Sequence, residues 1–497
     1  VVLSEQIVPG SFAFALDYLV DNELDLQAMD AKFKNDEVGA SAYDPRVMLK
    51  IVLLAYSQGL ISSRAIERAC VHNVQFIAIS GDSQPSHAHI AKFVCSLRDQ
   101  IKPLFTQVLM TCDAQGLIGR DLFAIDGVKL PSNASKERSG THAELQHRAK
   151  RLDQAADKIL ALHQSADNTT EDTALDSKRQ TQLDKLRREA ARTREFLAHA
   201  TKRTNAKGQE LKTNVTDPQS AKMATSKGVI QGYAAQAAVD AANQVIVAAD
   251  VIGSGSEQSM LLPLVEQSRP LANAQTLYTA DAGYHSDANL QALQAQGTPA
   301  LVADNQMRQR DERFKNQDRY KPKDDVLYDK QPTGGNPLSG KAVKWFKPED
   351  FRFNGDHTCT CPNGKLLTST GSIYNVGKGL RRDDFKAKKE DCAACTKRTR
   401  CLRHPERTAA RKVVYFHERQ INPDDPSHRM RQAIDSPRGR QLYSQRIGTV
   451  EPVFANIRHN KRLSRFNLRG REKVNTQWHL YCLVHNIEKL ARSGWRA

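Results

Sequence analysis

The sequence has no apolar run long enough to cross a bilayer, and it is poor in cysteine. A membrane-spanning helix needs about 18 consecutive apolar residues, whereas the longest apolar stretch, Val47–Tyr56, is interrupted by Lys50. No secretory signal is recognised after Val1. Nine cysteines in 497 residues are too few for a disulfide scaffold. These absences exclude a membrane protein and a disulfide-rich secreted protein, and they favour a cytoplasmic location.

Acidic residues are also in deficit, and the imbalance is concentrated near one end of the chain. The sequence holds 73 Lys and Arg against 56 Asp and Glu, which gives a net charge of +17. Residues 403–497 hold 20 basic and 8 acidic residues, so 20 − 8 = +12 of the excess lies there. Concentrated positive charge favours a polyanionic partner such as DNA. A solvated basic face without a ligand is the alternative.

The first part of the chain, residues 1–104, has the pattern of short helices. One is expected over Pro45–Tyr56, because Pro45 suits a helix start and Gly59 lies just beyond its end. Short helices joined by tight turns fit a helix-turn-helix-like DNA-binding domain. A helical bundle that packs on a catalytic core fits the same pattern, and helix spacing does not decide between the two.

Residues 118–303 alternate apolar strands with helices. The order of three strands, then helix, strand, helix and strand predicts an α/β fold with an RNase H-like core, a mixed sheet flanked by helices. A long polar segment over residues 141–203 predicts an antiparallel helical hairpin inserted into that sheet. Residues 304–436 form a polar insertion that is expected to be irregular, and residues 437–497 are expected to be helical with a basic tail.

Two carboxylates belong to the predicted strands. Asp126 lies within an otherwise apolar strand, where a charge is costly unless it is paired or bound to a metal ion. Asp281 ends another strand, and strand ends are where open α/β sheets place their sites. Capping of the next turn is the simpler explanation for a single aspartate in such a place.

A third carboxylate, Glu451, lies in a segment with helical pattern. Thr449 is a fair N-cap and Pro452 is tolerated in a first helical turn, so a helix is expected to begin here. The neighbouring cations Arg446, Arg458 and Lys461 favour a role beside DNA over a merely exposed glutamate.

These segments together resemble the motifs of bacterial insertion-sequence transposases of the DDE class. Asp126 follows the family's Ile-Asp-Gly pattern, and Asp281 lies in an Ala-Asp-Ala-Gly-Tyr-His-Ser segment. The third motif is similar to the family's Tyr-Arg-Glu-Lys signature, read here as Tyr443, Arg446, Glu451 and Arg458, with Arg in the place of Lys. The resemblance covers nearly the whole chain.

The resemblance implies a reaction and a set of roles. Asp126, Asp281 and Glu451 would bind two Mg²⁺ or Mn²⁺ ions, whose hard character suits carboxylate oxygens. The enzyme would hydrolyse phosphodiester bonds at the terminal inverted repeats, free 3′-OH ends and join them to target DNA. The resemblance also implies a homo-oligomer on DNA and a cytoplasmic, nucleoid-associated location. The residues expected to contact DNA or support the glutamate are Tyr443, Arg446, Arg458, Lys461 and His285.

Two other functions remain open on the sequence alone. A metal-dependent nuclease without strand transfer would use the same carboxylates. A non-catalytic DNA-binding protein descended from a transposase is the third hypothesis, and the presence of all three carboxylates argues against it.

Five cysteines cluster between Cys359 and Cys401, within a module expected at about residues 357–404. Cys-x2-Cys with further cysteines at a distance is typical of a structural zinc site. Unmetallated, reduced cysteines in a loop are the alternative. The preferred zinc ligands are Cys361, Cys392, Cys395 and Cys401. Cys359, His357 and His404 are alternative ligands.

Overall fold

The computed structural model describes residues 2–31, 42–166, 173–205, 208–226, 228–314, 316–317, 345–375, 380–417 and 425–495. Contacts divide the chain into two compact units. The first comprises Val1–Asp304 and Ser436–Ala497, and the second comprises Asn305–Asp435. No helix among the described residues has the length and apolar character needed to span a bilayer.

The first unit is built on a mixed sheet. Strand β5 (Gly228–Asp240) pairs antiparallel with β4 (Ala221–Thr225), β1 (Leu122–Pro131) and β6 (Ile246–Ile252). On the other side of β1, β7 (Leu277–Ala280) and then β8 (Ala300–Val302) join in parallel. This arrangement confirms the predicted α/β, RNase H-like fold class.

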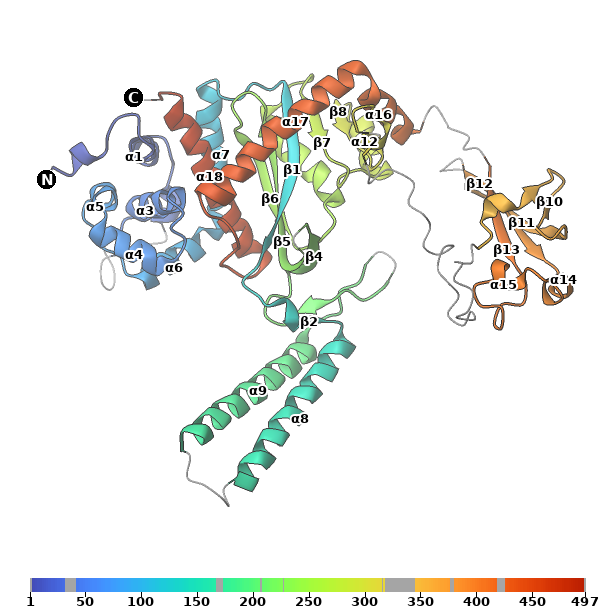
Figure 1. Ribbon diagram of the computed structural model, residues 1–497. Helices are drawn as coiled ribbons and strands as arrows, with labels where there is room; N and C mark the ends of the chain where they lie inside the picture. The colour runs from blue at the N-terminus through green and yellow to red at the C-terminus, as the bar shows by residue number, and fades with distance from the viewer. Residues whose placement is uncertain are drawn as a thin grey trace. The chain divides into compact units, whose positions relative to one another are not determined.

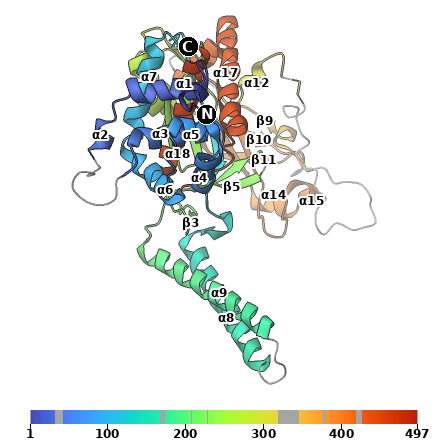
Figure 2. The ribbon, with the colours of Figure 1, turned by 90° about the vertical axis from the view of Figure 1, so that its left-hand side faces the viewer.

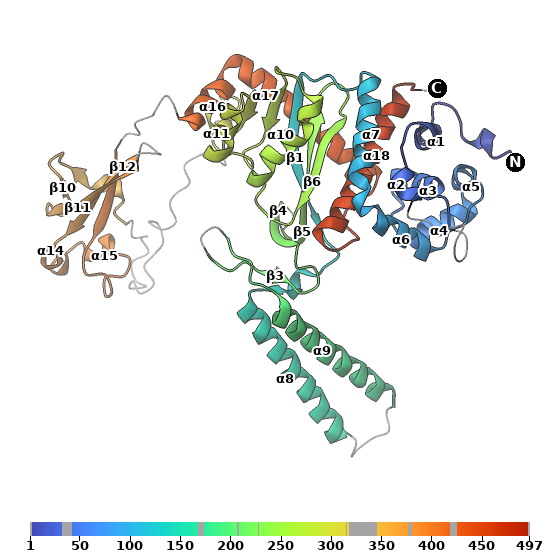
Figure 3. The same cartoon turned by 180° about the vertical axis from the view of Figure 1, so that it is seen from behind.

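Helices cover both faces of this sheet. Helix α17 (Pro437–Ala455) passes in front of β1 in Figure 1, whereas α10 (Leu261–Ser268) lies in front of the sheet when it is seen from behind in Figure 3. Helix α11 (Asp287–Ala295) connects β7 to β8, which keeps these two strands parallel.

The C-terminal helix α18 (Arg471–Arg492) joins the sheet to the N-terminal helices. It packs on β6 and on α1 (Phe12–Asn22), α3 (Pro45–Ser57) and α7 (Ile101–Ala114). Figure 2 shows α1 and α3 grouped with the short helices of this region, which are α2 (Gln27–Asp30), α4 (Ser63–His72), α5 (Val74–Ser80) and α6 (His87–Ser96). The predicted helix at Pro45–Tyr56 is therefore confirmed, with Asp44 as its N-cap.

The helical hairpin predicted within residues 141–203 is also confirmed. Helices α8 (His142–Ala166) and α9 (Thr173–His199) pack along a narrow seam that buries Leu145, Ala156 and Leu183. A small sheet of β2 (Ser139–Gly140) and β3 (Thr213–Asn214) lies at its base. Residues 167–172, between the two helices, lie outside the described residues.

The expectation that residues 304–436 are irregular is wrong. This unit contains an antiparallel sheet in the order β13 (Lys412–Phe416), β12 (Leu380–Ala387), β11 (Leu366–Asn375), β10 (Thr358–Thr360) and β9 (Arg352–Phe353). The core that this sheet buries is small and includes Phe351, Leu367, Phe385 and Val413, so its strands lack the apolar runs that mark the strands of the first unit. The unit's described helices are α12 (Met307–Arg310), α14 (Lys389–Ala393), α15 (Arg398–Cys401) and α16 (Pro426–Asp435).

Two histidines of α18 are buried in neutral form. The Nε2 of His485 lies 2.8 Å from the carbonyl of Gln244, and its Nδ1 lies 3.2 Å from the side-chain nitrogen of Asn456, which donates to it. Burial lowers the pKa of His485 to about 3 and the pKa of His479 to about 4. Neither ring therefore accepts a proton in the folded protein near neutral pH.

These histidines should make the first unit sensitive to mild acid. An unfolded histidine has a pKa of about 6.5, so below that pH the unfolded chain binds protons that the folded chain refuses. The stability that the neutral rings provide is present above pH 6.5 and is lost as the pH falls towards about 4 and 3. We expect the free energy of unfolding to fall by about 3–4 kcal/mol between pH 7 and pH 5.

Urea unfolding followed by tryptophan fluorescence at the two pH values measures this loss. The variant His485→Gln, whose side chain does not titrate, should lose about 2 kcal/mol less than the parent over the same interval. An equal loss in parent and variant would show that His485 does not cause the acid sensitivity.

Candidate active site

Two aspartates lie side by side on neighbouring strands. In the parallel pairing of β1 with β7, Ile125 is opposite Ala280, so the next residues along the two strands are Asp126 and Asp281. Adjacent strands are about 4.8 Å apart, which brings the two carboxylates into one place. The two strands are joined by a long stretch of chain, and the sheet alone makes them neighbours.

The guanidinium of Arg446 lies against both carboxylates. Its Nη2 is 3.0 Å from Oδ2 of Asp126 and 3.9 Å from Oδ2 of Asp281, and its Nε donates to the carbonyl of Ile125 at 3.4 Å. The Arg446 side chain is only 8% exposed. Arg446, which was expected to contact DNA or support the glutamate, is thus buried against the strand carboxylates.

The remaining oxygen of each aspartate accepts a backbone N–H close by in the sequence. Oδ1 of Asp126 accepts the N–H of Gly127 at 2.8 Å, and Oδ1 of Asp281 accepts the N–H of Gly283 at 2.8 Å. Turn capping, the simpler explanation from the sequence, thus accounts for one oxygen of Asp281, whereas Asp126 makes its contact inside strand β1. The Oδ2 atoms face a single positive charge instead, so this pair of oxygens is suited to a cation.

The electrostatics of Asp126 reflect the whole cluster. Burial raises its pKa above the usual value, Arg446 and the Gly127 N–H oppose this shift, and the charges of Asp281 and Glu451 raise the pKa further. The negative charges of Asp281 and Glu451 oppose ionisation of Asp126, so an added positive charge beside Asp126 would favour its ionised form.

Glu451 is carried by α17, which begins earlier than expected. The helix starts at Pro437 and is capped by Ser436, whereas the hydroxyl of Thr449 donates to the Gln445 carbonyl within the helix. The prediction of Thr449 as N-cap is therefore wrong. Pro452 lies inside the helix and has no N–H for the Gly448 carbonyl.

That carbonyl of Gly448 accepts a hydrogen bond from the Gln244 side chain at 3.2 Å. The replacement partner lets the helix continue past Pro452 and carry Glu451 and Arg446 on one element. Glu451 itself is exposed. Among the described residues, no group of three or more His, Cys, Asp or Glu side chains lies close enough together to hold a metal ion.

A fourth carboxylate, Glu257, was missed in the sequence. It follows β6 in a loop, and its Oε1 lies 4.0 Å from Nζ of Lys129 and 3.5 Å from Nε2 of Gln236. Burial raises its pKa, Lys129 lowers it, and Asp281 and Asp126 raise it. Glu257 therefore belongs to the same cluster, although no strand or helical period marked it.

Gln236 explains two features near this cluster. Its side chain lies so close to Gly127 that a Cβ there would be 2.2 Å from its Nε2, so the Asp-Gly sequence is needed for packing. Its Oε1 accepts a hydrogen bond from the hydroxyl of Tyr284, which is fully buried. The Asp281–Tyr284 turn is thereby anchored beneath the carboxylates.

The structure separates the predicted DNA-contacting residues by environment. Tyr443 is partly buried and lies within electrostatic range of Arg446. His285 is partly buried, and the side chain of Gln258 donates a hydrogen bond to the His285 carbonyl at 3.0 Å. Arg458 is exposed in a π-helical turn, Asn456–Asn460, that follows α17.

Lys461, which was expected to contact DNA, is buried in the structure. Its side chain is 1% exposed, and its Nζ lies 2.7 Å from Oε2 of Glu488 on α18. An ammonium group at this depth needs a counter-ion from a packed neighbour. Lys461 therefore fastens the end of the Glu451 segment to α18.

The clustered cysteines lie in the second unit. Cys359 is buried in its core, and Cys361, Cys392 and Cys401 pack against that core. Burial raises the pKa of the Cys401 thiol to about 11, Arg411 lowers it, and the thiols of Cys392, Cys395 and Cys361 raise it. Three of the four predicted ligands thus pack against one core, but the described cysteines do not form a group that could hold a metal ion. The Lys365 N–H donates to Sγ of Cys361 at 3.4 Å.

Comparison with known proteins gives three matches. Two family models, each described as a transposase DDE domain, match residues 178–368 and 360–491. A third, described as a transposase domain, matches residues 1–95. No curated protein matches the sequence. Asp281 and Glu451 fall within the matched ranges, whereas Asp126 lies between them.

The burial of Lys461 leads to a stability prediction. Lys461→Met should lower the free energy of unfolding by about 3 kcal/mol, the lower end for a broken buried pair, because Glu488 retains Asn456 and Arg492 as neighbours. Arg458→Met, which removes an exposed cation three residues away, should change it by less than about 0.5 kcal/mol. Chemical denaturation of both variants makes the comparison, and equal effects would contradict the buried pair.

Proposed function

Because the chain belongs to the DDE transposases of insertion sequences, we propose that Asp126, Asp281 and Glu451 are the carboxylates with which this DNA transposase cuts and joins DNA. The observation that carries the proposal is the convergence of Asp126 and Asp281 on one buried cation, the guanidinium of Arg446. Neighbouring strands present two acidic oxygens to a single positive charge, as a metal site requires.

The donor set fits divalent metal ions. Mg²⁺ and Mn²⁺ prefer carboxylate oxygens, and Oδ2 of Asp126 and Oδ2 of Asp281 already share a cation. Asp126 and Asp281 would hold the ions from the sheet, and the exposed Glu451 would complete the set from α17. Two such ions supply charge neutralisation at phosphorus and an activated nucleophile. Glu257 would add negative charge beside the same ions.

The chain's own residues would position the substrate. Arg446, on the same helix as Glu451, would neutralise the aspartates when no ion is bound. Arg458 is exposed and suited to a phosphate, and Tyr443 and His285 would line the approach to the carboxylates.

Two displacement reactions follow at this site. In the first, a water oxygen bonds to phosphorus at the end of the element, and the bond to the 3′ oxygen breaks, which frees a 3′-OH. In the second, that 3′ oxygen bonds to a phosphorus of the target DNA and displaces the target's own 3′ oxygen. Both are in-line exchanges at phosphorus and need no external energy source.

The N-terminal helices are proposed to contact the element ends. On α4, Arg64 and Arg68 are exposed and lie one helical turn apart. The packing of α1 and α3 on α18 would fix such a contact relative to the sheet. Transposition joins paired ends, so we also propose that the enzyme works as a homo-oligomer on DNA in the cytoplasm.

Removal of any one carboxylate should abolish cleavage. Asp126→Asn, Asp281→Asn and Glu451→Gln should each lower the cleavage rate at least about 1000-fold, which corresponds to ~4 kcal/mol of transition-state stabilisation. Binding of DNA carrying the element's end should persist, because phosphate contacts lie elsewhere. Gel-shift and cleavage assays on the same preparations measure both properties.

The matched control is Asp121→Asn, an exposed aspartate immediately before β1, which should cleave at the parental rate. Cleavage by any of the three site variants at more than a tenth of the parental rate would remove that residue from the proposed set. A strand-transfer assay with pre-cleaved element ends distinguishes the two enzymes. A transposase joins these ends to target DNA, whereas a nuclease that lacks strand transfer does not.

For the second unit we propose a structural zinc site formed by Cys361, Cys392, Cys395 and Cys401. The packing of Cys361, Cys392 and Cys401 against one small core and the Cys-x2-Cys spacing of Cys392 and Cys395 support it. All four ligands would come from the protein, which is typical of a structural rather than a catalytic zinc ion.

Metal analysis tests this proposal. Purified protein should contain about one zinc per chain, and Cys392→Ser should lose it and unfold at a lower temperature in the second unit. Cys359→Ser changes a core thiol outside the proposed ligand set and should retain zinc. Zinc-free parental protein with unchanged stability would contradict the site.

A further inference from the structure

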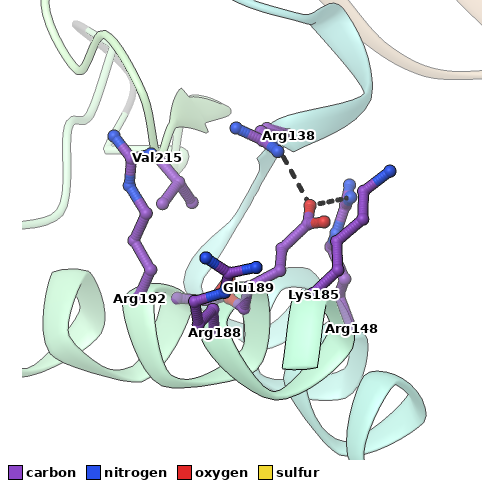
Figure 4. Close-up of a pocket in the computed structure, with 8 residues that line it drawn as sticks. Arg138, Arg148, Lys185, Arg188, Glu189, Arg192 and Val215 are labelled. Carbon is purple, nitrogen blue, oxygen red and sulfur yellow. Dashed lines mark hydrogen bonds and ion pairs between the residues drawn. The ribbon is translucent and has the colours of Figure 1, made fainter. Parts of the chain in front are cut away.

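A strongly basic pocket lies at the base of the helical hairpin, away from the carboxylates. It encloses about 300 Å³, and three separate segments of chain supply its walls. Figure 4 shows the side chains that line it, most of them from α9. Its charged residues are Arg138, Arg148, Lys185, Arg188, Glu189 and Arg192.

Helical spacing gathers the α9 residues on one face. Lys185, Arg188 and Arg192 are related by three and four residues, so they lie on one side of the helix. With Arg138 and Arg148 the pocket holds five cations against one carboxylate, a net charge of 5 − 1 = +4. No ion pair joins Lys185 or Arg192 to another described residue. Such a concentration of like charge favours a polyanion as ligand.

Glu189 organises the pocket and does not neutralise it. Its Oε1 lies 3.2 Å from Nε of Arg138 and 2.8 Å from Nη2 of Arg148, so one carboxylate holds two guanidinium groups in place. Figure 4 shows these two contacts as dashed lines. The remaining cations, Lys185, Arg188 and Arg192, are exposed at the pocket.

The pocket is fastened to the catalytic sheet. The carbonyl of Arg138 accepts the N–H of Val215 at 3.0 Å, and Arg203, just beyond α9, donates to the carbonyls of Pro218, Ser220 and Gly253. Arg138 also continues the chain from β1, the strand that carries Asp126. A ligand held here is therefore kept in a defined position relative to the carboxylates.

We infer that this pocket binds the phosphodiester backbone of the DNA on which the enzyme acts. The inference rests on the proposed function, since it assigns a second contact to the same substrate. Planar guanidinium groups match phosphate oxygens, and several cations from different segments suit a run of phosphates. The contact carries no sequence information and fixes the position of the duplex.

The chain limits how far this contact lies from the cleaved bond. Arg138 follows Asp126 by 138 − 126 = 12 residues, which span at most about 40 Å when fully extended. Phosphates along one strand are spaced about 3.4 Å apart, so a phosphate beside the backbone of Arg138 lies within about twelve base pairs of Asp126.

The test compares two double variants of α9 in the full-length protein. Lys185→Ala/Arg192→Ala removes two pocket cations, and Lys178→Ala/Arg187→Ala removes two cations of the same helix that do not line the pocket. All four side chains are exposed at helical positions, so both variants should fold. The probe is a fluorescently labelled DNA duplex of arbitrary sequence, titrated at several salt concentrations.

Each phosphate contact adds about 0.9 to the slope of log affinity against log salt. The pocket variant should therefore lose about two from the parental slope, and the control should lose much less. Between about 50 and 200 mM salt the parental affinity should fall about 12-fold more than that of the pocket variant. Footprinting on end DNA should show protection that the pocket variant loses and the control variant keeps.

The outcomes are distinguishable. Parental protein that binds no DNA would overturn the proposed function together with this inference. Parental protein that binds DNA, with equal slopes for the two double variants, would overturn the inference alone. Calorimetry measures whether inorganic phosphate binds to the pocket. Saturable binding of free phosphate would assign the pocket to a small anion instead of DNA.

Discussion

The ion pair between Arg446 and the two strand aspartates is the interaction on which the site depends. Two carboxylates on adjacent strands, partly buried, would repel each other and lose hydration without a counter-charge. Arg446 supplies that charge at 3.0 Å from Asp126 and 3.9 Å from Asp281. It reaches them only because α17 lies across β1, so the same contact that neutralises the pair also sets where Glu451 is held.

The structure keeps α17 in that position through contacts far along the chain. Gln244 satisfies the carbonyl that Pro452 leaves without a partner, and Lys461 pairs with Glu488 after the helix has ended. Helix α18, which carries Glu488, packs in turn on β6 and on the N-terminal helices. Because several elements together fix the position of α17, the geometry of the carboxylates depends on the stability of the whole first unit.

Much of this could be read from the sequence, and the exceptions share one cause. Asp126 stood out as a charge within an apolar strand, and the strand order of the core follows from hydrophobic pattern, which is local. The burial of Arg446 and Lys461 depends on partners 320 and 27 residues away, respectively, and no local pattern reveals such partners. Glu257 lies in a loop, where neither strand nor helical period singles out a residue. The sheet of the second unit was missed because its strands bury only a small core and lack long apolar runs.

The most direct test is to locate a divalent ion in the protein. Crystals of the full chain grown with Mn²⁺ and DNA carrying a cleaved element end should show anomalous density between the carboxylates of Asp126 and Asp281, with Glu451 turned towards it and the Arg446 guanidinium displaced. Density for manganese elsewhere, with Arg446 still against both aspartates in protein that cleaves DNA, would contradict the account.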